Sequence, residues 1–514
     1  MEKRSRKKRR TSVDWFVGKI ALLLTIFMGF IFLISVCSTK LLPVKFLAVI
    51  ALALILVAFL VGLLTWKSKY RGRYIVGLLF AVLMCVVYGF GTSYVFRGLS
   101  TAKEITTVRT ESAAVGIYVR ADDQNDYAQV AGTYSYGILS QQDRENTNEA
   151  IRQIEEEYAT TLKTQEYDGL ALLIDGILGG QVDAIIMNSA YLDLLSEMEG
   201  YEDAAQQLKE VQVTHVVREV QEEPSQEPEI PEDRLVGNTG EADTTNEADE
   251  EQPQSGKIFT VFISGIDNRG ALVEKSRSDV NILASVNTAT KQVVLISTPR
   301  DYYVPLSISG GANDKLTHAG IYGVDVCMDT MTMLYNVNVD YYFRVNFAGF
   351  EDIIDALGGV TVNSEQSFST ENYSFQAGDN TMNGKQALEF VRERHAFASG
   401  DRQRGKNQLA LMKAVINKAL SPELLMNYNS LLSALQGSFE TSIPYDTVSD
   451  IVREQLDQGG DWNVVSYSVD GTGSSQVTYS QGQKAYVMIP DESTVETAKS
   501  LIAQVYNGET VTAP

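Results

Sequence analysis

Residues 257–301 read KIFTVFISGIDNRGALVEKSRSDVNILASVNTATKQVVLISTPRD, and this stretch decides the fold. It contains three apolar runs, Phe259–Ile266, Val280–Val286 and Gln292–Ser297, with the length and β-branched composition of buried strands. The five residues Asn287–Lys291 that separate the second run from the third predict a hairpin. The stretch therefore predicts three neighbouring strands in an α/β domain.

Charged residues stand at the ends of these predicted strands. If the first strand also runs antiparallel to the second, Asp267, Asp279 and Arg300 share one edge of the sheet. Two carboxylates, together with phosphate oxygens and water, are a usual way to hold Mg²⁺. An arginine beside them binds phosphate with two parallel hydrogen bonds, which a lysine cannot do. This edge is therefore predicted to bind Mg²⁺ and a phosphate group.

A second group of charged residues follows a predicted helix at 384–391. Two of its arginines are two positions apart, so both reach one ligand only where the helix ends. Three further polar residues are spaced by three and four, which places them on one face of a helix that begins after Gly400. The two arginines are Arg392 and Arg394, and the three polar residues are Asp401, Arg404 and Gln408. Any one of them is explained by a surface salt bridge, but together they favour an anion site, and phosphate is the natural anion.

The N-terminal part of the chain predicts a membrane anchor. The uncharged apolar runs Ile20–Cys37, Phe46–Trp66 and Tyr74–Phe96 are each about long enough to span a bilayer as a helix. Residues 1–16 carry seven Lys and Arg side chains, and the loop Lys67–Arg73 is also basic. The positive-inside rule places both basic segments in the cytoplasm. We therefore predict a basic cytoplasmic tail at 1–16, three transmembrane helices at 17–97 and extracellular domains beyond them.

Composition excludes several classes of protein. The 514 residues carry a formal charge of -22, whereas a general nucleic-acid binder presents a basic face. Three cysteines and three histidines provide neither a disulfide framework nor the spacing of a structural zinc site. The basic tail has the composition of a nucleic-acid arm, but its place before a membrane span favours a topological role. No nucleic-acid partner is predicted.

The chain beyond the membrane helices divides into three segments. Residues 98–218 alternate short strands and helices and predict a small α/β accessory domain, which shows no cluster of catalytic residue types and is expected to bind a partner. Residues 219–256 carry thirteen acidic side chains against one Arg, which predicts a disordered linker. Residues 257–514 contain the charged clusters and are predicted to form the catalytic domain. Within it, 324–334 and 347–357 are expected to form core-facing helices, some of whose residues are candidates to line an apolar tunnel.

Seven motifs in this order resemble the LytR–CpsA–Psr family. They are GIDNR, RSD, TPRD, KLTHAGIYG, FAGFEDIIDALGGV, NGKQALEFVRER and DRQRGKNQ, within residues 257–420. The three-span start resembles the CpsA-like members associated with capsule loci of Gram-positive bacteria. The resemblance implies an α/β/α sandwich around a mixed sheet, with an apolar tunnel for a lipid. It also implies a Mg²⁺-dependent phosphotransferase that moves a glycopolymer, here capsular polysaccharide, from a polyprenyl-pyrophosphate carrier to peptidoglycan through a phosphodiester bond.

The resemblance also assigns roles to residues of this chain. Asp267 and Asp279 match the Mg²⁺ ligands. The remaining charged positions match catalytic residues and phosphate-binding residues, and Arg300 has both roles. The catalytic set is Arg277, Arg300, Asp401 and Arg404, and the phosphate-binding set is Arg300, Arg392, Arg394 and Gln408. Asn407 departs from the family pattern, which often has arginine there, and the general base is left open between an Asp near the metal and, less favoured, His395.

Two other functions remain open from the sequence. The first is a non-catalytic membrane regulator or sensor that works with other capsule-assembly proteins. The second is a polyprenyl-pyrophosphate hydrolase, in which water replaces the acceptor hydroxyl. The same arginines and aspartates serve transfer and hydrolysis, so the sequence does not separate these two reactions.

Overall fold

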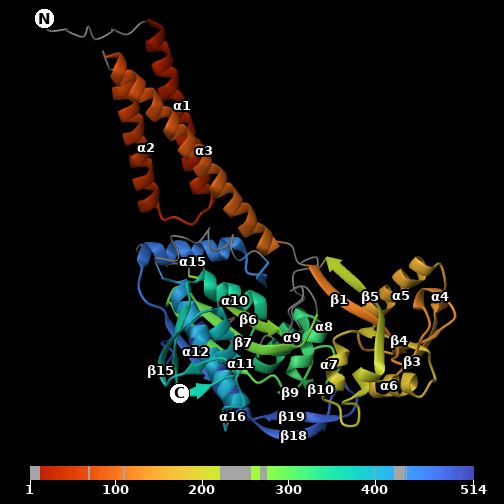
Figure 1. The fold of residues 1–514 in the computed structure, drawn as a ribbon. Helices are drawn as coiled ribbons and strands as arrows, with labels where there is room; N and C mark the ends of the chain where they lie inside the picture. The colour runs from red at the N-terminus through yellow and green to blue at the C-terminus, as the bar shows by residue number, and fades with distance from the viewer. Residues whose placement is uncertain are drawn as a thin grey trace, which may run out of the picture. The chain divides into compact units, whose positions relative to one another are not determined.

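The computed structural model of the chain describes residues 12–66, 70–107, 110–219, 256–266, 275–398, 400–421, 435 and 437–513. Two compact units are present, and each is considered by itself. The first contains the N-terminal helices and 443–461, and the second contains two domains built on separate sheets (Figure 1). The predicted acidic linker lies almost wholly outside the described residues, as do residues 1–11 of the basic tail.

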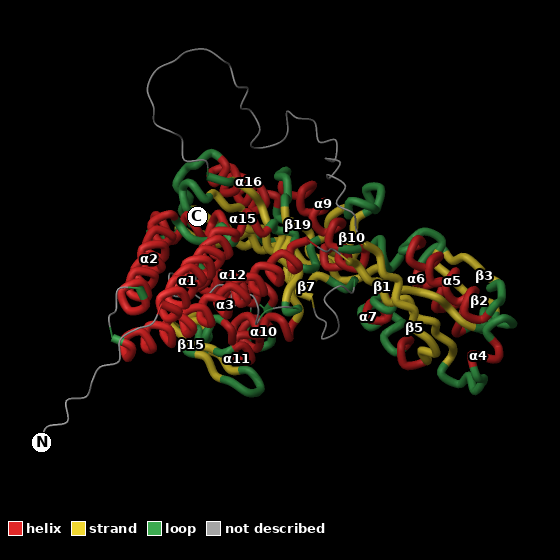
Figure 2. Tube along the Cα trace, turned by 90° about the horizontal axis from the view of Figure 1, so that it is seen from above, coloured by secondary structure: helices red, strands yellow, loops and turns green. Residues whose placement is uncertain are grey.

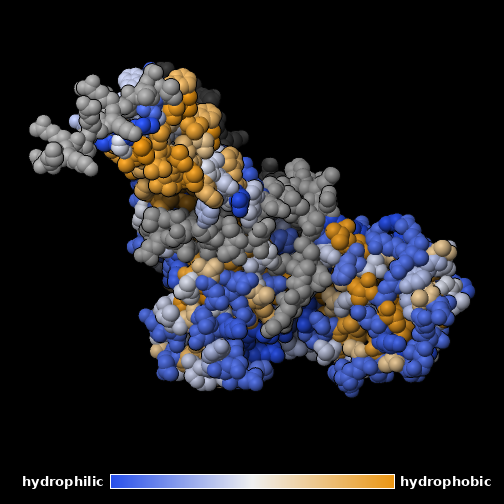
Figure 3. All heavy atoms as spheres, turned by 45° about the horizontal axis from the view of Figure 1, so that its top comes forward, coloured by the Kyte–Doolittle hydropathy of each residue, from blue (hydrophilic) through white to orange (hydrophobic). Residues whose placement is uncertain are grey.

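Three long helices begin the chain: α1 (Ser12–Ser38), α2 (Val44–Thr65) and α3 (Arg71–Thr107). Each contains an apolar stretch long enough to cross a membrane, as predicted. Large side chains such as Leu23 and Leu52 are exposed on them, and Figure 3 shows apolar surface gathered over these helices. A continuous apolar surface of this kind is unfavourable in water. The three helices are therefore suited to a bilayer.

Helix α15 (Tyr445–Gln458) contacts the connection between α1 and α2 within the first unit. The Tyr445 hydroxyl donates a hydrogen bond of 2.8 Å to the Thr39 carbonyl, and Lys40 forms a 3.1 Å ion pair with Asp446. With three spans, this connection and every residue after α3 lie on the same side of a membrane. The contacts between α15 and the α1–α2 connection agree with their placement on one side of the membrane.

The accessory domain, which we define as residues 110–219, is a five-stranded sheet of order β3-β2-β4-β1-β5. Figure 2 shows β1 and β5 side by side in this domain. Side chains alternate along β1, so Val115 and Ile117 pack toward α5, whereas Tyr118 packs toward α6 and α7. Helices thus cover both faces. The strands are β1 (Thr110–Arg120), β2 (Ser135–Leu139), β3 (Lys163–Tyr167), β4 (Ala184–Asn188) and β5 (Leu208–Glu219). The helices are α4 (Tyr127–Val130), α5 (Arg144–Tyr158), α6 (Leu170–Leu178), α7 (Tyr191–Leu195) and η1 (Ala204–Gln207).

The large domain comprises the described residues of 256–417, 437–442 and 462–513. Its six-stranded sheet has the order β16-β11-β6-β7-β8-β17. The three strands predicted from 257–301 are neighbours in antiparallel pairs, and parallel partners flank them, so the sheet is mixed. The strands are β6 (Ile258–Ile266), β7 (Ser278–Asn287), β8 (Gln292–Thr298), β11 (Tyr341–Asn346), β16 (Phe439–Thr441) and β17 (Asn463–Ser468).

Helices pack on both faces of this sheet, which confirms the predicted α/β/α sandwich. On one face, Phe262 and Leu283 are fully buried against α9 (Val324–Tyr335) and α16 (Glu492–Tyr506). On the other face, Ile263 and Ile282 point into a cavity beneath three helices. These helices are α10 (Phe347–Ala356), α11 (Gly384–Arg392) and α12 (Asp401–Ala419).

Short elements complete the large domain at the ends of the sheet. They include the hairpin β18–β19, whose first strand the sequence did not predict because it alternates glycine and small polar residues. The strands are β9 (Tyr303–Pro305), β10 (Asn313–Lys315), β12 (Val360–Ser364), β13 (Phe368–Ser369), β14 (Ser374–Phe375), β15 (Gly378–Met382), β18 (Gly471–Val477) and β19 (Lys484–Pro490). The helices are η3 (Leu316–His318) and α8 (Ala319–Tyr322).

Gly349 of α10 lies very close to the backbone of Ser438. A Cβ atom built on it would lie 1.7 Å from the Ser438 carbonyl oxygen, which belongs to the backbone and cannot rotate away. We therefore expect Gly349→Ala to lower the free energy of unfolding by about 1–3 kcal/mol, in the range of overpacking. Thermal unfolding of the detergent-solubilised chain measures this, with Gly72→Ala as control, because a Cβ there meets nothing within 4 Å. Equal unfolding temperatures for the two variants would contradict the prediction.

Candidate active site

The cavity beneath α10, α11 and α12 has a volume of about 820 Å³. Its floor is formed by the strands β6, β7 and β11, and its walls combine an apolar lining with a group of charged side chains. Helix α9, which was expected to contribute to a lipid tunnel, packs in the core on the opposite face and does not line this cavity, whereas α10 does. The apolar lining consists of Ile263, Ile282, Val345, Phe347, Phe350, Leu388, Val391, Leu411 and Met412.

Asp279 and Arg300 meet at one edge of the sheet, as predicted from the strand pairing. Ser278 at the start of β7 lies opposite Ile266 at the end of β6, and Asn281 lies opposite Thr298 at the end of β8. Asp279, next to Ser278, and Arg300, two residues after Thr298, therefore lie at the same edge of the sheet. Arg300 Nη1 lies 3.0 Å from Asp279 Oδ1, and both residues line the cavity.

Two carboxylates hold the Arg300 guanidinium in its charged form. Burial acts most strongly and would lower the pKa of Arg300, but Asp279 and Asp301 outweigh it and raise that pKa above its usual value. Among the described residues, no hydrogen-bond acceptor reaches the buried Nε of Arg300, and Asp301 Oδ2 is 3.8 Å from it. The Thr317 hydroxyl donates a 3.3 Å hydrogen bond to Asp279 Oδ1, which orients the carboxylate. The result is a fixed, charged arginine with an unused donor.

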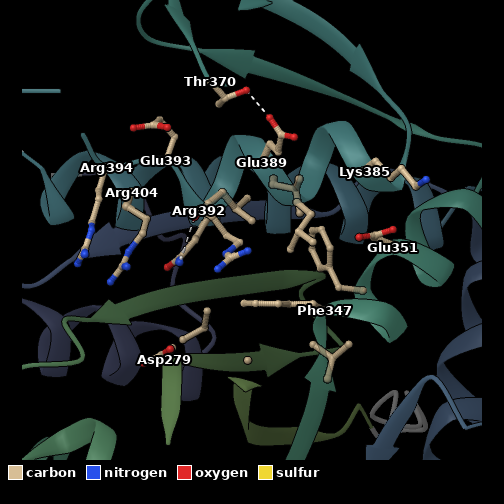
Figure 4. Close-up of a pocket in the computed structure, with 18 of the residues that line it drawn as sticks. Asp279, Phe347, Glu351, Thr370, Lys385, Glu389, Arg392, Glu393, Arg394 and Arg404 are labelled. Atoms are coloured by element: carbon tan, nitrogen blue, oxygen red, sulfur yellow. Dashed lines mark hydrogen bonds between the residues drawn. The ribbon is translucent and has the colours of Figure 1, made fainter. Parts of the chain in front are cut away.

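The two arginines at the end of α11 both line the cavity because the helix stops between them. Asn383 begins the helix with a capping box, and Glu393 after its last residue has extended backbone angles. The Arg392 guanidinium lies 4.2 Å from the centre of the Phe347 ring, a cation–π contact. Arg394 Nε donates to His395 Nε2 at 3.3 Å. Figure 4 shows Arg392, Arg394 and Arg404 pointing to the same side of the cavity, above Asp279.

Helix α12 contributes Arg404 and Gln408 to the cavity lining. Asp401 does not line it, but its carboxylate accepts a 2.8 Å hydrogen bond from Arg404 Nη2 and so orients that guanidinium. Burial lowers the pKa of Arg404, and the charge of Arg300 adds to this effect, although Asp401 opposes it. An anion in the cavity would offset the repulsion between these buried cations.

Besides Asp401, two predicted site residues are not placed in the cavity. Asp267 lies outside the described residues. Arg277 is described but does not line the cavity, and its Nη1 pairs instead with Glu197 of the accessory domain at 2.7 Å. The sequence carries no signal for this partner, which is 80 positions earlier in the chain.

Asn407, the departure from the family pattern, does not face the cavity. Its buried side chain donates to the Phe390 carbonyl at 3.3 Å and accepts from Gln403 at 3.2 Å, so it ties α12 to α11. His395 does line the cavity. The sequence also did not indicate a polar group farther along the wall, where the hydroxyl of Thr370 and the amide of Asn372 donate to the Glu389 carboxylate (Figure 4).

The donor set at this edge is compatible with Mg²⁺. Among the residues that the structure describes, no three His, Cys, Asp or Glu side chains form a metal-binding group. Mg²⁺ is usually held by one or two carboxylates, with phosphate oxygens and water completing its shell. The cavity-lining Asp279 provides one such carboxylate beside four arginines, and Asp267 is the predicted second. A complete protein cage is not needed for this mode of binding.

The chain is similar in sequence and in fold to known bacterial cell-wall proteins. The chain is 34% identical over 222 residues to a polyisoprenyl-teichoic acid–peptidoglycan teichoic acid transferase TagU of Oceanobacillus iheyensis, which covers 42% of this chain and 68% of the relative. It is 33% identical over 217 residues to TagU of Bacillus subtilis, covering 42% and 69%. The crystal structure of B. subtilis TagV matches 50% of this chain and 99% of its own, with 23% identity and a TM-score of 0.42. Residues 233–501, more than half of the chain, match the LytR_cpsA_psr family, and the chain belongs to that family.

Proposed function

We propose that this protein transfers a glycopolymer from a polyprenyl-pyrophosphate carrier to peptidoglycan, and that the polymer is a capsular polysaccharide. The observation that carries the proposal is a single cavity in which four arginines adjoin an apolar wall. A lipid pyrophosphate has the same two parts, because a charged head is joined to a long hydrocarbon chain. The TagU relatives are named polyisoprenyl-teichoic acid–peptidoglycan teichoic acid transferases, which supports transfer to peptidoglycan from a polyisoprenyl carrier.

The arginines act on the phosphates in this proposal. Arg300, Arg392, Arg394 and Arg404 hold the pyrophosphate, and they stabilise the charge that develops as the bond breaks. The acceptor hydroxyl oxygen attacks the phosphorus that carries the polymer. The bond from that phosphorus to the bridging oxygen breaks, the polyprenyl phosphate leaves, and the hydroxyl proton passes to a base. The product is a phosphodiester between polymer and peptidoglycan.

Asp279 has two tasks in this mechanism. It pairs with Arg300 and keeps that guanidinium directed at the phosphates. Together with Asp267, it would also hold Mg²⁺, which supplies positive charge to phosphate oxygens when bound. Asp401 orients Arg404 in the same manner as Asp279 orients Arg300.

The membrane placement is part of the proposal. Three apolar helices anchor the chain, and the basic residues of 1–16 and 67–73 favour a cytoplasmic N-terminus. Three spans then place the accessory and large domains outside the cell, where peptidoglycan is found. The acceptor and the lipid carrier are both accessible from that side.

A reconstituted reaction tests the proposed function. The detergent-solubilised chain is incubated with Mg²⁺, a polyprenyl-pyrophosphate-linked oligosaccharide and soluble peptidoglycan fragments, and mass spectrometry detects the phosphodiester-linked product. We expect this conjugate. Release of oligosaccharide phosphate without conjugate, with acceptor present, would support a hydrolase instead. No turnover by folded protein would support a non-catalytic regulator.

The apolar wall predicts how lipid length affects binding. Phe350 lines the cavity from α10, so Phe350→Glu places a carboxylate where hydrocarbon is expected. We expect KM for a long polyprenyl substrate to rise about tenfold or more, because burying that charge is costly. For a substrate with a very short prenyl chain, we expect little change. Steady-state kinetics with both substrates measures this, with Phe350→Leu as an apolar control, and equal effects on both substrates would contradict it.

A further inference from the structure

Glu197 of the accessory domain lies against the large domain, two residues after the end of α7. Its carboxylate bridges two cations, with Oε1 2.7 Å from Arg277 Nη1 and Oε2 2.7 Å from Lys315 Nζ. Burial would raise the pKa of Glu197, but Lys315 and Arg277 outweigh it and lower that pKa to about 2. Glu197 is therefore ionised at physiological pH.

From Lys315 a chain of charges continues to the cavity. The Lys315 side chain is only 4% exposed, and its Nζ lies 3.4 Å from Asp301 Oδ1. The other oxygen of Asp301 is 3.8 Å from Arg300 Nε, and Arg300 pairs with Asp279. Opposite charges thus alternate from the accessory domain to the residue that we place on the pyrophosphate.

Further contacts fix the two domains beside this chain of charges. The backbone N–H of Lys275 donates to the Ser112 carbonyl at 2.9 Å, and Lys275 Nζ pairs with Glu111 at 3.2 Å. Ile321 of α8 is fully buried among apolar side chains of the accessory domain. Because several independent contacts hold the interface, Glu197 is not needed to keep the domains together.

We propose that Glu197 is a positioning residue for the pyrophosphate site, so that the accessory domain completes the site through Lys315, Asp301 and Arg300. The inference rests on the proposed function, because it takes Arg300 as a ligand of the pyrophosphate. Arg277, a predicted catalytic residue, pairs with Glu197 and holds its carboxylate in place.

The charges explain why Glu197 matters. A buried lysine requires a nearby anion, because an unpaired charge is strongly unfavourable there. Without Glu197, Lys315 has Asp301 as its remaining partner in this chain of charges, and the attraction draws that carboxylate away from Arg300. Arg300 then pairs with Asp279 alone, and its guanidinium shifts from the position in which it holds the pyrophosphate.

Lipid binding by the full chain in detergent tests this role separately from turnover. Calorimetry compares geranylgeranyl pyrophosphate with geranylgeraniol, which has the same hydrocarbon chain and no phosphate. We expect Glu197→Gln to weaken binding of the pyrophosphate about tenfold and to leave binding of the alcohol unchanged. Glu197→Asp should restore part of the affinity. Glu199→Gln, at an exposed position two residues away, should bind both lipids like the unmodified chain.

Other binding results would contradict either the role of Glu197 or the proposed pyrophosphate site. Removing a negative charge should by itself tighten binding of an anion, so equal or tighter binding by Glu197→Gln would overturn the positioning role. Weaker binding of both lipids, or the same weakening in Glu199→Gln, would also overturn it. Arg300→Ala serves as the reference. If Arg300→Ala does not weaken pyrophosphate binding, the proposed site fails, whereas a loss in Arg300→Ala alone contradicts only the role of Glu197.

Discussion

Replacing Arg300 with alanine is expected to lower the rate of phosphodiester formation by about 10³-fold, the upper range for removing one preorganised donor from a reacting anion. Arg300 is half-buried at the sheet edge, pairs with Asp279 at 3.0 Å, and lines the cavity. Its loss also leaves the Asp279 carboxylate without its cation, so the site becomes more negative where it must accept phosphate. Single-turnover kinetics with saturating lipid substrate measures the effect on the chemical step.

Two further variants show whether a rate loss in Arg300→Ala is specific to this guanidinium. Arg300→Lys keeps the charge but not the planar fork, so we expect it to recover only a small part of the rate. Arg402→Ala removes an arginine from α12 that pairs with Asp470 and does not line the cavity, and it should retain nearly full activity. A rate for Arg300→Ala within about tenfold of the unmodified chain would exclude Arg300 as a phosphate ligand.

Asp279→Asn is expected to lower the rate by about 10²–10³-fold and to raise the Mg²⁺ concentration needed for half-maximal rate. Asparagine has the same shape and can still accept a hydrogen bond from Arg300, so the change removes mainly the negative charge. A loss of metal affinity therefore reports on the metal, not on the position of Arg300. Rates measured over a range of Mg²⁺ concentrations provide this comparison.

The exposed Asp461 offers a matched control for this titration. Asp461→Asn removes the same charge away from the cavity, and its Mg²⁺ dependence should equal that of the unmodified chain. If Asp279→Asn reduces the maximal rate but leaves the Mg²⁺ dependence unchanged, the negative charge of Asp279 serves the reaction without holding the metal. Unchanged rate and unchanged dependence would remove Asp279 from the site.

The sheet edge could be predicted from the sequence because local patterns determine it. Three apolar runs and a five-residue turn establish antiparallel pairing, and pairing alone brings Asp279 to Arg300. The end of α11 could also be predicted, given that Arg392 and Arg394 bind one ligand. Two arginines at this spacing share the cavity only where the helix stops. In each case, the information lies within about twenty residues of the chain.

The interface between the domains could not be predicted, because its partners are far apart in the chain. Arg277 belongs to the RSD motif, which resembles part of a phosphate site, yet its partner Glu197 is 80 positions away in another domain. Nothing in the periodicity of either segment indicates that contact. Asp401 also illustrates this limit, since the spacing of α12 predicts a charged face but not which of its members line the cavity.

The first and last strands of the accessory domain have a consequence for how this protein evolved. β1 and β5 are antiparallel neighbours, with Thr110 opposite Glu219, so the chain enters and leaves the domain at adjacent points. A single genetic insertion or deletion of 110–219 would therefore leave the rest of the path uninterrupted. Descendants that lost the domain would retain Lys315 and Arg277 without Glu197. In such descendants Lys315 would keep Asp301 as a partner, and the influence of Glu197 on Arg300 would be absent.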